Sequence, residues 1–227
     1  DAGSRVEAPD RYTPPTGQTL KDSHDHPVER LTLAGILAES SNTGTVQVGE
    51  KIPKQVRYDY LRKFGFGQKS GLGLPGESAG ILHPADSWDG RTEYAVLFGQ
   101  SVSVNAIQAT SVFSTIANGG VRATPSIVAG TTDERGELVP AERPAPERVV
   151  SQETADTVLH MMESVVEEGT GSSASVPGYR VAGKTGTAEA AGDDGRLSGI
   201  MASFIGVAPA DDPRSVSDRR VRARATR

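Results

Sequence analysis

The sequence contains no cysteine among its 227 residues, so disulfide bonds and thiolate chemistry are excluded. Aromatic residues account for only 5% of it. No apolar run approaches the roughly 18 residues that a membrane-spanning helix needs. No signal peptide is visible, and the first residue is Asp1 rather than methionine. We therefore expect the chain to be a piece of a longer protein. Its 36% apolar and 23% charged residues are typical of a globular domain.

Positive charge is scarce except at the C-terminal end. Residues 214–227 hold six arginines and one aspartate, a net charge of +5. Because the whole chain has a net charge of −5, residues 1–213 have a net charge of −10. An acidic body excludes a nucleic-acid groove. The tail has two apolar residues, Val216 and Val221, and no recognisable strand or helix face. We expect 214–227 to be an aberrant, disordered basic tail. It is either an arm that touches anionic lipid or wall polymer, or the product of a frameshift or assembly error.

Hydrophobic periodicity predicts both helices and strands in 1–213. Caps and apolar spacing favour four helices, at 32–39, 53–64, 105–117 and 151–168. Asn105 and Ser151 are the predicted caps of the last two, and the last has an apolar stripe of Val158, Met162, Val165 and Val166. SSNTG (40–44) is expected to end the first helix. Two strand-like segments, 179–187 and 199–208, are joined by AEAAGDDGRLS, and 65–80 and 129–148 are expected to be loops or excursions. Helices and strands do not alternate strictly, so the predicted class is α+β.

The stretch GYRVAGKTGTAE (178–189) fits two patterns. Gly178, four residues, then Gly183-Lys184-Thr185 matches a phosphate-binding P-loop. A P-loop needs a buried strand before the glycine turn and a helix after it. Here EEGTGSSASVP precedes the motif, the middle residues YRVA favour extended structure, and Gly186 follows directly. The sequence therefore argues against a P-loop nucleotidase.

Taken as an exposed strand, the same stretch can dock a peptide. Lys184 and Gly186 are predicted on one face, Thr185 and Thr187 on the other. Lys184 supplies positive charge for a carboxylate, the two threonine hydroxyls can bind that carboxylate, and Gly186 lets another backbone lie close. An extended peptide could add to the strand by backbone hydrogen bonds. The alternative is an ordinary surface strand with a solvated lysine.

A second motif, Ser40-Ser41-Asn42, has the form Ser-x-Asn at a helix end. Such spacing can place a hydroxyl and an amide in one cleft, although helix ends are commonly rich in these residues. Known serine acyl-transferases pair Ser-x-Asn and Lys-Thr-Gly with a third motif, Ser-x-x-Lys, that holds the nucleophile. No serine of this chain has a lysine three residues later. The chain thus contains two motifs of the three and no candidate nucleophile.

With these residues the chain resembles the class B penicillin-binding proteins, which are peptidoglycan transpeptidases. It is most similar to the FtsI-like, division-specific type and looks actinobacterial. The resemblance extends from about Pro9 to Pro213. It rests on LAGILAESSNTGTVQVGEKI, FGFGQKSGLGLPGESAG, FGQSVSVNAIQ, IANGGVRATPSIV and VAGKTGTAE. It implies an α+β transpeptidase fold, an antiparallel sheet flanked by helices, which in this chain would be incomplete at both ends.

Carried onto this sequence, the resemblance implies roles for the motif residues. Ser40 would move a proton to and from the leaving and attacking amines, and Asn42 would hold the substrate amide. Lys184 would hydrogen-bond Ser40 and attract the terminal carboxylate of the substrate, which Thr185 and Thr187 would bind. The backbone N–H of Thr187 would form half of an oxyanion hole. A serine absent from this chain would attack the penultimate D-Ala carbonyl, D-Ala would leave, and a second peptide amine would take the acyl group.

The resemblance also implies a cellular setting. The parent protein would act at the outer face of the cytoplasmic membrane, held by an N-terminal anchor, on peptidoglycan stem peptides, and β-lactams would inhibit it. Its partners would be a septal glycosyltransferase and other division proteins. No cofactor or metal is implied. The alternatives are a DD-carboxypeptidase or serine β-lactamase, in which water takes the acyl group, and a non-catalytic binding module.

Two other groups of residues could suggest function. Asp22, His24, Asp25 and His26 are metal-ligand types, but they lack a recognisable ligand spacing, and we interpret them as a solvated turn. Trp88 is expected to be a core anchor rather than a platform for a sugar ring.

Overall fold

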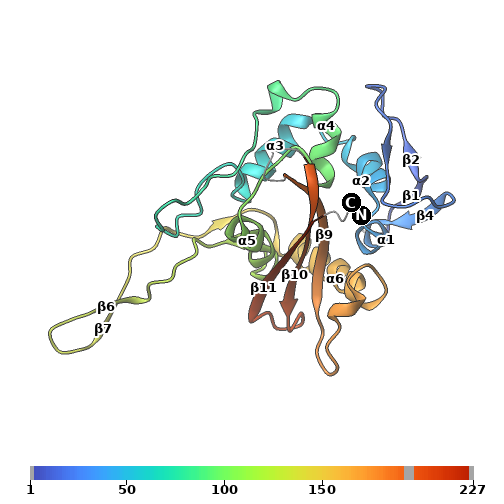
Figure 1. The fold of residues 1–227 in the computed structure, drawn as a ribbon. Coiled ribbons are helices and arrows are strands. Elements are labelled where there is room, and N and C mark those ends of the chain that lie inside the picture. The colour runs from blue at the N-terminus through green and yellow to red at the C-terminus, as the bar shows by residue number, and fades with distance from the viewer. Residues whose placement is uncertain (1–2, 192–196, 225–227) are drawn as a thin grey trace.

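The computed structural model describes residues 3–191 and 197–224 of the chain. Its centre is an antiparallel sheet in the order β11-β10-β9 (Figure 1). These strands are β9 (Ala182–Ala191), β10 (Leu197–Ala208) and β11 (Ser215–Arg224). The strands predicted at 179–187 and 199–208 are present as β9 and β10, but β9 begins at Ala182 and the two strands extend into both ends of the predicted connection. Part of their predicted connection, residues 192–196, lies outside the described residues.

Two helices pack on one face of this sheet. These are α5 (Ala106–Ala117) and α6 (Gln152–Glu167). Ala182 and Val207 are fully buried against them, because strand side chains alternate and these two share the inward face. The buried core cluster contains Ile116, Leu159, Met162, Ala182, Val207 and Ala210.

The helix boundaries follow the predicted caps. Asn105 and Gln108 form a reciprocal capping box at the start of α5, and the Ser151 hydroxyl accepts a hydrogen bond from the Thr154 backbone N–H at the start of α6. The predicted first and second helices are also present. They are α1 (Leu33–Glu39), which Thr32 caps, and α3 (Lys54–Lys63).

The segment SSNTG does end α1, but a further helix begins inside it. This helix is α2 (Asn42–Gly49), with Ser41 as its N-cap. Its apolar stripe is weak, and the sequence prediction missed it. The remaining helical segments are η1 (Ala85–Ser87), α4 (Thr92–Ala95), η2 (Val96–Phe98) and η3 (Ser172–Ala174).

Short strand pairs flank these elements. The pairs are β1 (Arg5–Ala8) with β4 (Glu29–Thr32), β2 (Arg11–Tyr12) with β3 (Leu20–Lys21), β5 (Val121–Arg122) with β8 (Glu147–Arg148), and β6 (Gly130–Thr132) with β7 (Leu138–Pro140). The β6–β7 hairpin lies within the predicted excursion 129–148 and projects away from the sheet (Figure 1). Trp88 is buried in a second core cluster with Ala85 and Val96, which confirms it as a core anchor.

The predicted disorder of the C-terminal tail is wrong for residues 215–224. They form β11, which pairs with β10 along its length, so β10 is an inner strand rather than an exposed edge. The ladder needs only backbone groups, which an arginine-rich sequence supplies as well as an apolar one. Val216 packs against the core, and Arg220 forms an ion pair of 2.9 Å with Asp218.

The class is α+β, as predicted. In the described residues no helix is both long and apolar enough to cross a lipid bilayer.

Candidate active site

Ser40 stands at the turn between α1 and α2. Its backbone is left-handed, with φ 58° and ψ 37°, a region that non-glycine residues rarely adopt. Two backbone hydrogen bonds fix the turn, from Ser40 N to Leu37 O (3.3 Å) and from Ser41 N to Ile36 O (3.0 Å). Ser41 is 4% exposed and turns inward to cap α2, whereas Ser40 is exposed. The sharp turn thus presents the Ser40 hydroxyl outward.

Asn42 is the first residue of α2. Its Nδ2 donates a hydrogen bond of 3.0 Å to the backbone carbonyl of Lys21 at the end of β3. This bond fixes the plane of the amide. In the described part of the chain the amide oxygen Oδ1 accepts no hydrogen bond. This oxygen and the second amide hydrogen are therefore the groups that a ligand could bind.

Lys184 comes from β9, far along the chain. Its Nζ donates to Ser40 Oγ at 2.8 Å, across a sequence separation of 144 residues, and to the Thr185 carbonyl at 3.1 Å. Burial removes water from the ammonium and lowers the pKa of Lys184 from 10.5 to about 8. A lysine with this pKa exchanges a proton with a neighbouring hydroxyl more readily than a solvated one does.

Two threonines of the same strand, Thr185 and Thr187, lie close to Lys184 along β9. Thr185 Oγ1 shares a hydrogen bond of 2.7 Å with Thr170 Oγ1, from the loop after α6. The Lys184 ammonium lies within 3.5 Å of Thr185 Oγ1, although consecutive side chains leave a strand on opposite faces. Thr187 is exposed. β9 is an edge strand in the sheet order, so part of its backbone is free to pair.

Gly186 lies opposite Ser203 on β10. A Cβ atom at Gly186 would come within 2.7 Å of Ser203 Oγ, which donates to the Gly186 carbonyl at 3.3 Å. A larger side chain at position 186 would therefore press on Ser203 within the sheet, a constraint that the sequence did not reveal.

These residues line one cleft of about 570 Å³ between the α1–α2 turn and β9. It brings together the sequence-predicted residues Ser40, Asn42, Lys184, Thr185, Gly186 and Thr187. The cleft also includes Thr170, Leu97 and Phe98, which the sequence analysis did not place at the site, although Phe98 begins the stretch FGQSVSVNAIQ. The two motifs therefore meet in space, as a docking site for a carboxylate-bearing peptide requires.

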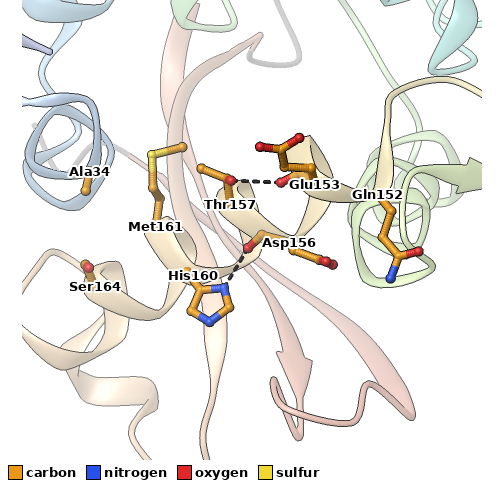
Figure 2. Close-up of a pocket in the computed structure, with 8 residues that line it drawn as sticks. All are labelled: Ala34, Gln152, Glu153, Asp156, Thr157, His160, Met161 and Ser164. Carbon is orange, nitrogen blue, oxygen red and sulfur yellow. Dashed lines mark hydrogen bonds between the residues drawn. The ribbon is translucent and has the colours of Figure 1, made fainter. Parts of the chain in front are cut away.

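A larger hollow of about 770 Å³ lies beside α6, and Figure 2 shows the residues that line it. Two of its polar side chains, Thr157 and His160, bond to backbone carbonyls of α6. Thr157 Oγ1 donates to the Glu153 carbonyl (2.8 Å), and His160 Nδ1 lies 2.7 Å from the Asp156 carbonyl (Figure 2). None of the motif residues lines it. This hollow offers no convergent reactive groups.

The interpretation of residues 22–26 as a solvated turn is wrong for Asp22 and His26, whose side chains are 5% and 6% exposed. Asp22 accepts hydrogen bonds from the α1–α2 turn, and these partners lie 19 and 21 residues away, where local sequence gives no signal. His24 and Asp25 are exposed, as expected. Within the described residues no group of three or more His, Cys, Asp or Glu side chains is placed to hold a metal ion.

Residues 7–217 match the family described as the penicillin binding protein transpeptidase domain. The chain belongs to this family. Penicillin-binding protein PbpB of Mycobacterium tuberculosis is 41% identical over 214 residues, which cover 88% of this chain and 31% of that protein. Peptidoglycan D,D-transpeptidase FtsI of Escherichia coli is 36% identical over 200 residues, covering 87% and 32%.

The fold is that of solved penicillin-binding transpeptidase domains. The crystal structure of penicillin-binding protein 3 from Mycobacterium tuberculosis, complexed with aztreonam, aligns with a TM-score of 0.92 and 38% identity. The alignment covers 99% of this chain and 52% of that one. The chain spans about a third of the length of the curated relatives it matches.

Proposed function

We propose that this chain is part of a serine-type peptidoglycan DD-transpeptidase that acts in septal cell-wall synthesis. The observation that carries the proposal is the 2.8 Å hydrogen bond from Lys184 Nζ to Ser40 Oγ, which joins two family motifs in one cleft. Membership of the transpeptidase family, and the names of relatives such as peptidoglycan D,D-transpeptidase FtsI, support the reaction class.

In this proposal Ser40 and Lys184 share the proton transfer. Lys184 donates to Ser40 Oγ, which leaves the Ser40 hydroxyl proton free to pass to the leaving D-Ala amine. The second amine would return a proton to Ser40 when it attacks the acyl-enzyme. Because its pKa is about 8, Lys184 is mostly protonated at neutral pH and also attracts the terminal carboxylate of the stem peptide.

Recognition of that carboxylate falls to the threonines. Thr170 holds the Thr185 hydroxyl, so Thr185 is oriented before a substrate arrives. Thr187 is exposed at the same strand and would add a second hydroxyl, while its backbone N–H would supply half of an oxyanion hole. Asn42, fixed by Lys21, would bind the substrate amide through the side of its amide that stays free.

The nucleophile would come from a Ser-x-x-Lys motif outside this sequence. The parent protein would be anchored at the outer face of the cytoplasmic membrane, with β-lactams as inhibitors and with a septal glycosyltransferase and division proteins as partners. We expect this chain alone to form no acyl-enzyme. Incubation with labelled penicillin should leave no stoichiometric covalent adduct, and such an adduct would refute this part of the proposal.

The docking function can be tested on the chain itself by NMR titration with diacetyl-Lys-D-Ala-D-Ala. We expect shifts at Lys184, Thr185 and Thr187, and much weaker binding of the same peptide with its C-terminal carboxylate amidated. Equal binding of both peptides, or of neither, would contradict the proposed carboxylate site.

A second candidate is a non-catalytic binding module, which would keep the docking strand that carries Lys184, Thr185 and Thr187 without a nucleophile. Sequencing the source DNA upstream of this reading frame separates the two. An in-frame Ser-x-x-Lys supports the transpeptidase, and an open frame without one supports the module. A DD-carboxypeptidase or β-lactamase would be recognised by hydrolysis of the acyl-enzyme by water when no acceptor amine is present.

A further inference from the structure

The Asp22 carboxylate lies directly behind the α1–α2 turn. Its Oδ2 accepts from Ser41 Oγ at 2.8 Å, and its Oδ1 accepts from the Thr43 backbone N–H at 2.9 Å. The Thr43 N–H belongs to the first turn of α2, where backbone donors lack partners inside the helix. α2 has no acidic residue in its own first turn, so Asp22 supplies from outside the negative charge that favours this helix end.

This arrangement holds the two motif residues on either side of Ser41. Ser41 caps α2 by accepting from the Gly44 N–H (3.0 Å), and it donates its own hydroxyl proton to Asp22. Ser40, just before it, is kept in the left-handed conformation by that same turn. Asn42, just after it, is bound to the carbonyl of Lys21, the neighbour of Asp22. One short segment, 21–22, therefore positions both functional side chains.

The His26 ring is bound on both sides by acceptors. Its Nε2 lies 3.1 Å from Asp22 Oδ2, and its Nδ1 lies 2.8 Å from the Pro27 carbonyl oxygen. A carbonyl oxygen can only accept. The Asp22 carboxylate oxygens also accept from Ser41 and Thr43. Acceptors that face both ring nitrogens favour a ring that carries a proton on each, which is an imidazolium.

The surroundings agree with a charged ring. Glu29 Oε2 lies 4.0 Å from His26 Nδ1, and the His24 ring lies 5.3 Å away, centroid to centroid. The hydrogen bond to the Pro27 carbonyl raises the pKa of His26, burial opposes it, and the bond to Asp22 adds to the rise. His24 is exposed, and Arg11 forms an ion pair of 3.2 Å with Asp25 of the same loop.

We propose that His26, as an imidazolium ion-paired with Asp22, is a positioning residue that holds Ser40 and Asn42 in their working geometry. It acts through Asp22 and does not touch the cleft. Loss of the ring proton removes one of the two hydrogen bonds and the charge on the ion pair, and the α1–α2 turn then loosens. The functional part of this inference rests on the proposed transpeptidase site, whereas its structural part does not.

The first test is an NMR pH titration of the intact chain, with ¹⁵N detection of the histidine rings and backbone amides. We expect one titration in which both His26 nitrogens are protonated below the midpoint, a midpoint above the ordinary value of about 6.5, and amide shifts of Ser40 and Asn42 with the same midpoint. A His26 midpoint at or below the ordinary value, or Ser40 and Asn42 amides whose shifts do not follow it, would overturn the proposal.

The second test measures the affinity of diacetyl-Lys-D-Ala-D-Ala across pH in two matched variants. His26→Gln removes the charge and keeps a donor, and His24→Gln changes an exposed histidine of the same loop. We expect His26→Gln to bind on the order of tenfold more weakly at pH 6.5 and to lose the pH dependence at the His26 midpoint, since misplaced groups bind poorly. His24→Gln should follow the wild type.

The outcomes separate this inference from the proposed function. If the wild-type chain does not bind the peptide, the docking site fails, and the titration alone decides the positioning role. If the wild type binds and His26→Gln has the same affinity and pH profile, the positioning role fails while the docking site stands. Should His26→Gln not fold, Asp22→Asn, which keeps the size of the side chain, takes its place with the same expectation.

Discussion

Glu163 and Arg180 are joined by two hydrogen bonds, 2.9 Å from Arg180 Nε and 2.8 Å from its NH2 group. The Glu163 side chain is 8% exposed in the middle of α6, and Arg180 precedes β9. The pair therefore ties the long helix to the strand that carries Lys184.

We predict that Glu163→Ala lowers the free energy of unfolding by about 2 kcal/mol, since a hydrogen-bonded charged pair is broken and Arg180 is left without this partner. Arg180→Ala should cost at least as much, because it leaves the Glu163 carboxylate, which is 8% exposed, without this partner. Urea denaturation of both variants measures the difference. Equal, small effects would mean that the pair does not stabilise the helix–strand contact.

Lys184 should give the stability of the chain a distinctive pH dependence. Its folded pKa of about 8 lies below its ordinary 10.5, so between these values the unfolded chain holds a proton that the folded chain has released. Burial of the charge thus costs stability below about pH 8, and the cost disappears as pH rises toward 10.5. We expect the stability of the wild type relative to Lys184→Met to rise from pH 8 to 10. A flat difference would show that the pKa is not lowered.

Gly186 and Ser203 should be energetically coupled. The φ angle of Gly186 is not in the left-handed region, so alanine suits the backbone, yet its Cβ would press on Ser203 Oγ. In a Ser203→Ala background, Gly186→Ala should stabilise the strand by about 0.5 kcal/mol. In the wild type we expect the same change to be about 1 kcal/mol less favourable, because the serine must rotate and lose its hydrogen bond. A double-mutant cycle with no coupling would contradict this contact.

The ordered C-terminal strand can be tested with two valines. Val216 packs against the core, whereas Val221 is 56% exposed. We predict that Val216→Ser lowers the free energy of unfolding by about 1.5 kcal/mol and that Val221→Ser changes it by less than about 0.5 kcal/mol. Near-zero effects for both in denaturation experiments would indicate a disordered tail after all.

The helices that begin at a recognisable N-cap residue could be predicted from sequence. Ser151 and Asn105 were identified as caps, and the apolar stripe of α6 marked its inner face. α2 could not be found in this way, because Asp22, a residue distant in sequence, completes its N-terminus. β11 was missed for a related reason. Its register comes from the β10 ladder, and only Val216 carries the inward pattern.

The site residues could be named from motifs, but their geometry could not. Nothing local indicates that Lys184 reaches Ser40, since that contact depends on how the sheet edge meets the α1–α2 turn. The burial of Asp22 and His26 was likewise invisible, because charged residues in a polar stretch are usually solvated.

At Ser40 the left-handed backbone lowers the stability of the fold, while the side chain supplies the hydroxyl that Lys184 binds. A non-glycine residue in this region costs roughly 1 kcal/mol, and glycine would remove that cost. Glycine would also remove the hydroxyl that Lys184 binds. Selection for a more stable chain would therefore favour Ser40→Gly, whereas selection for the proposed proton transfer would retain the serine. A screen of this domain for stability alone would lead away from the proposed function at this residue.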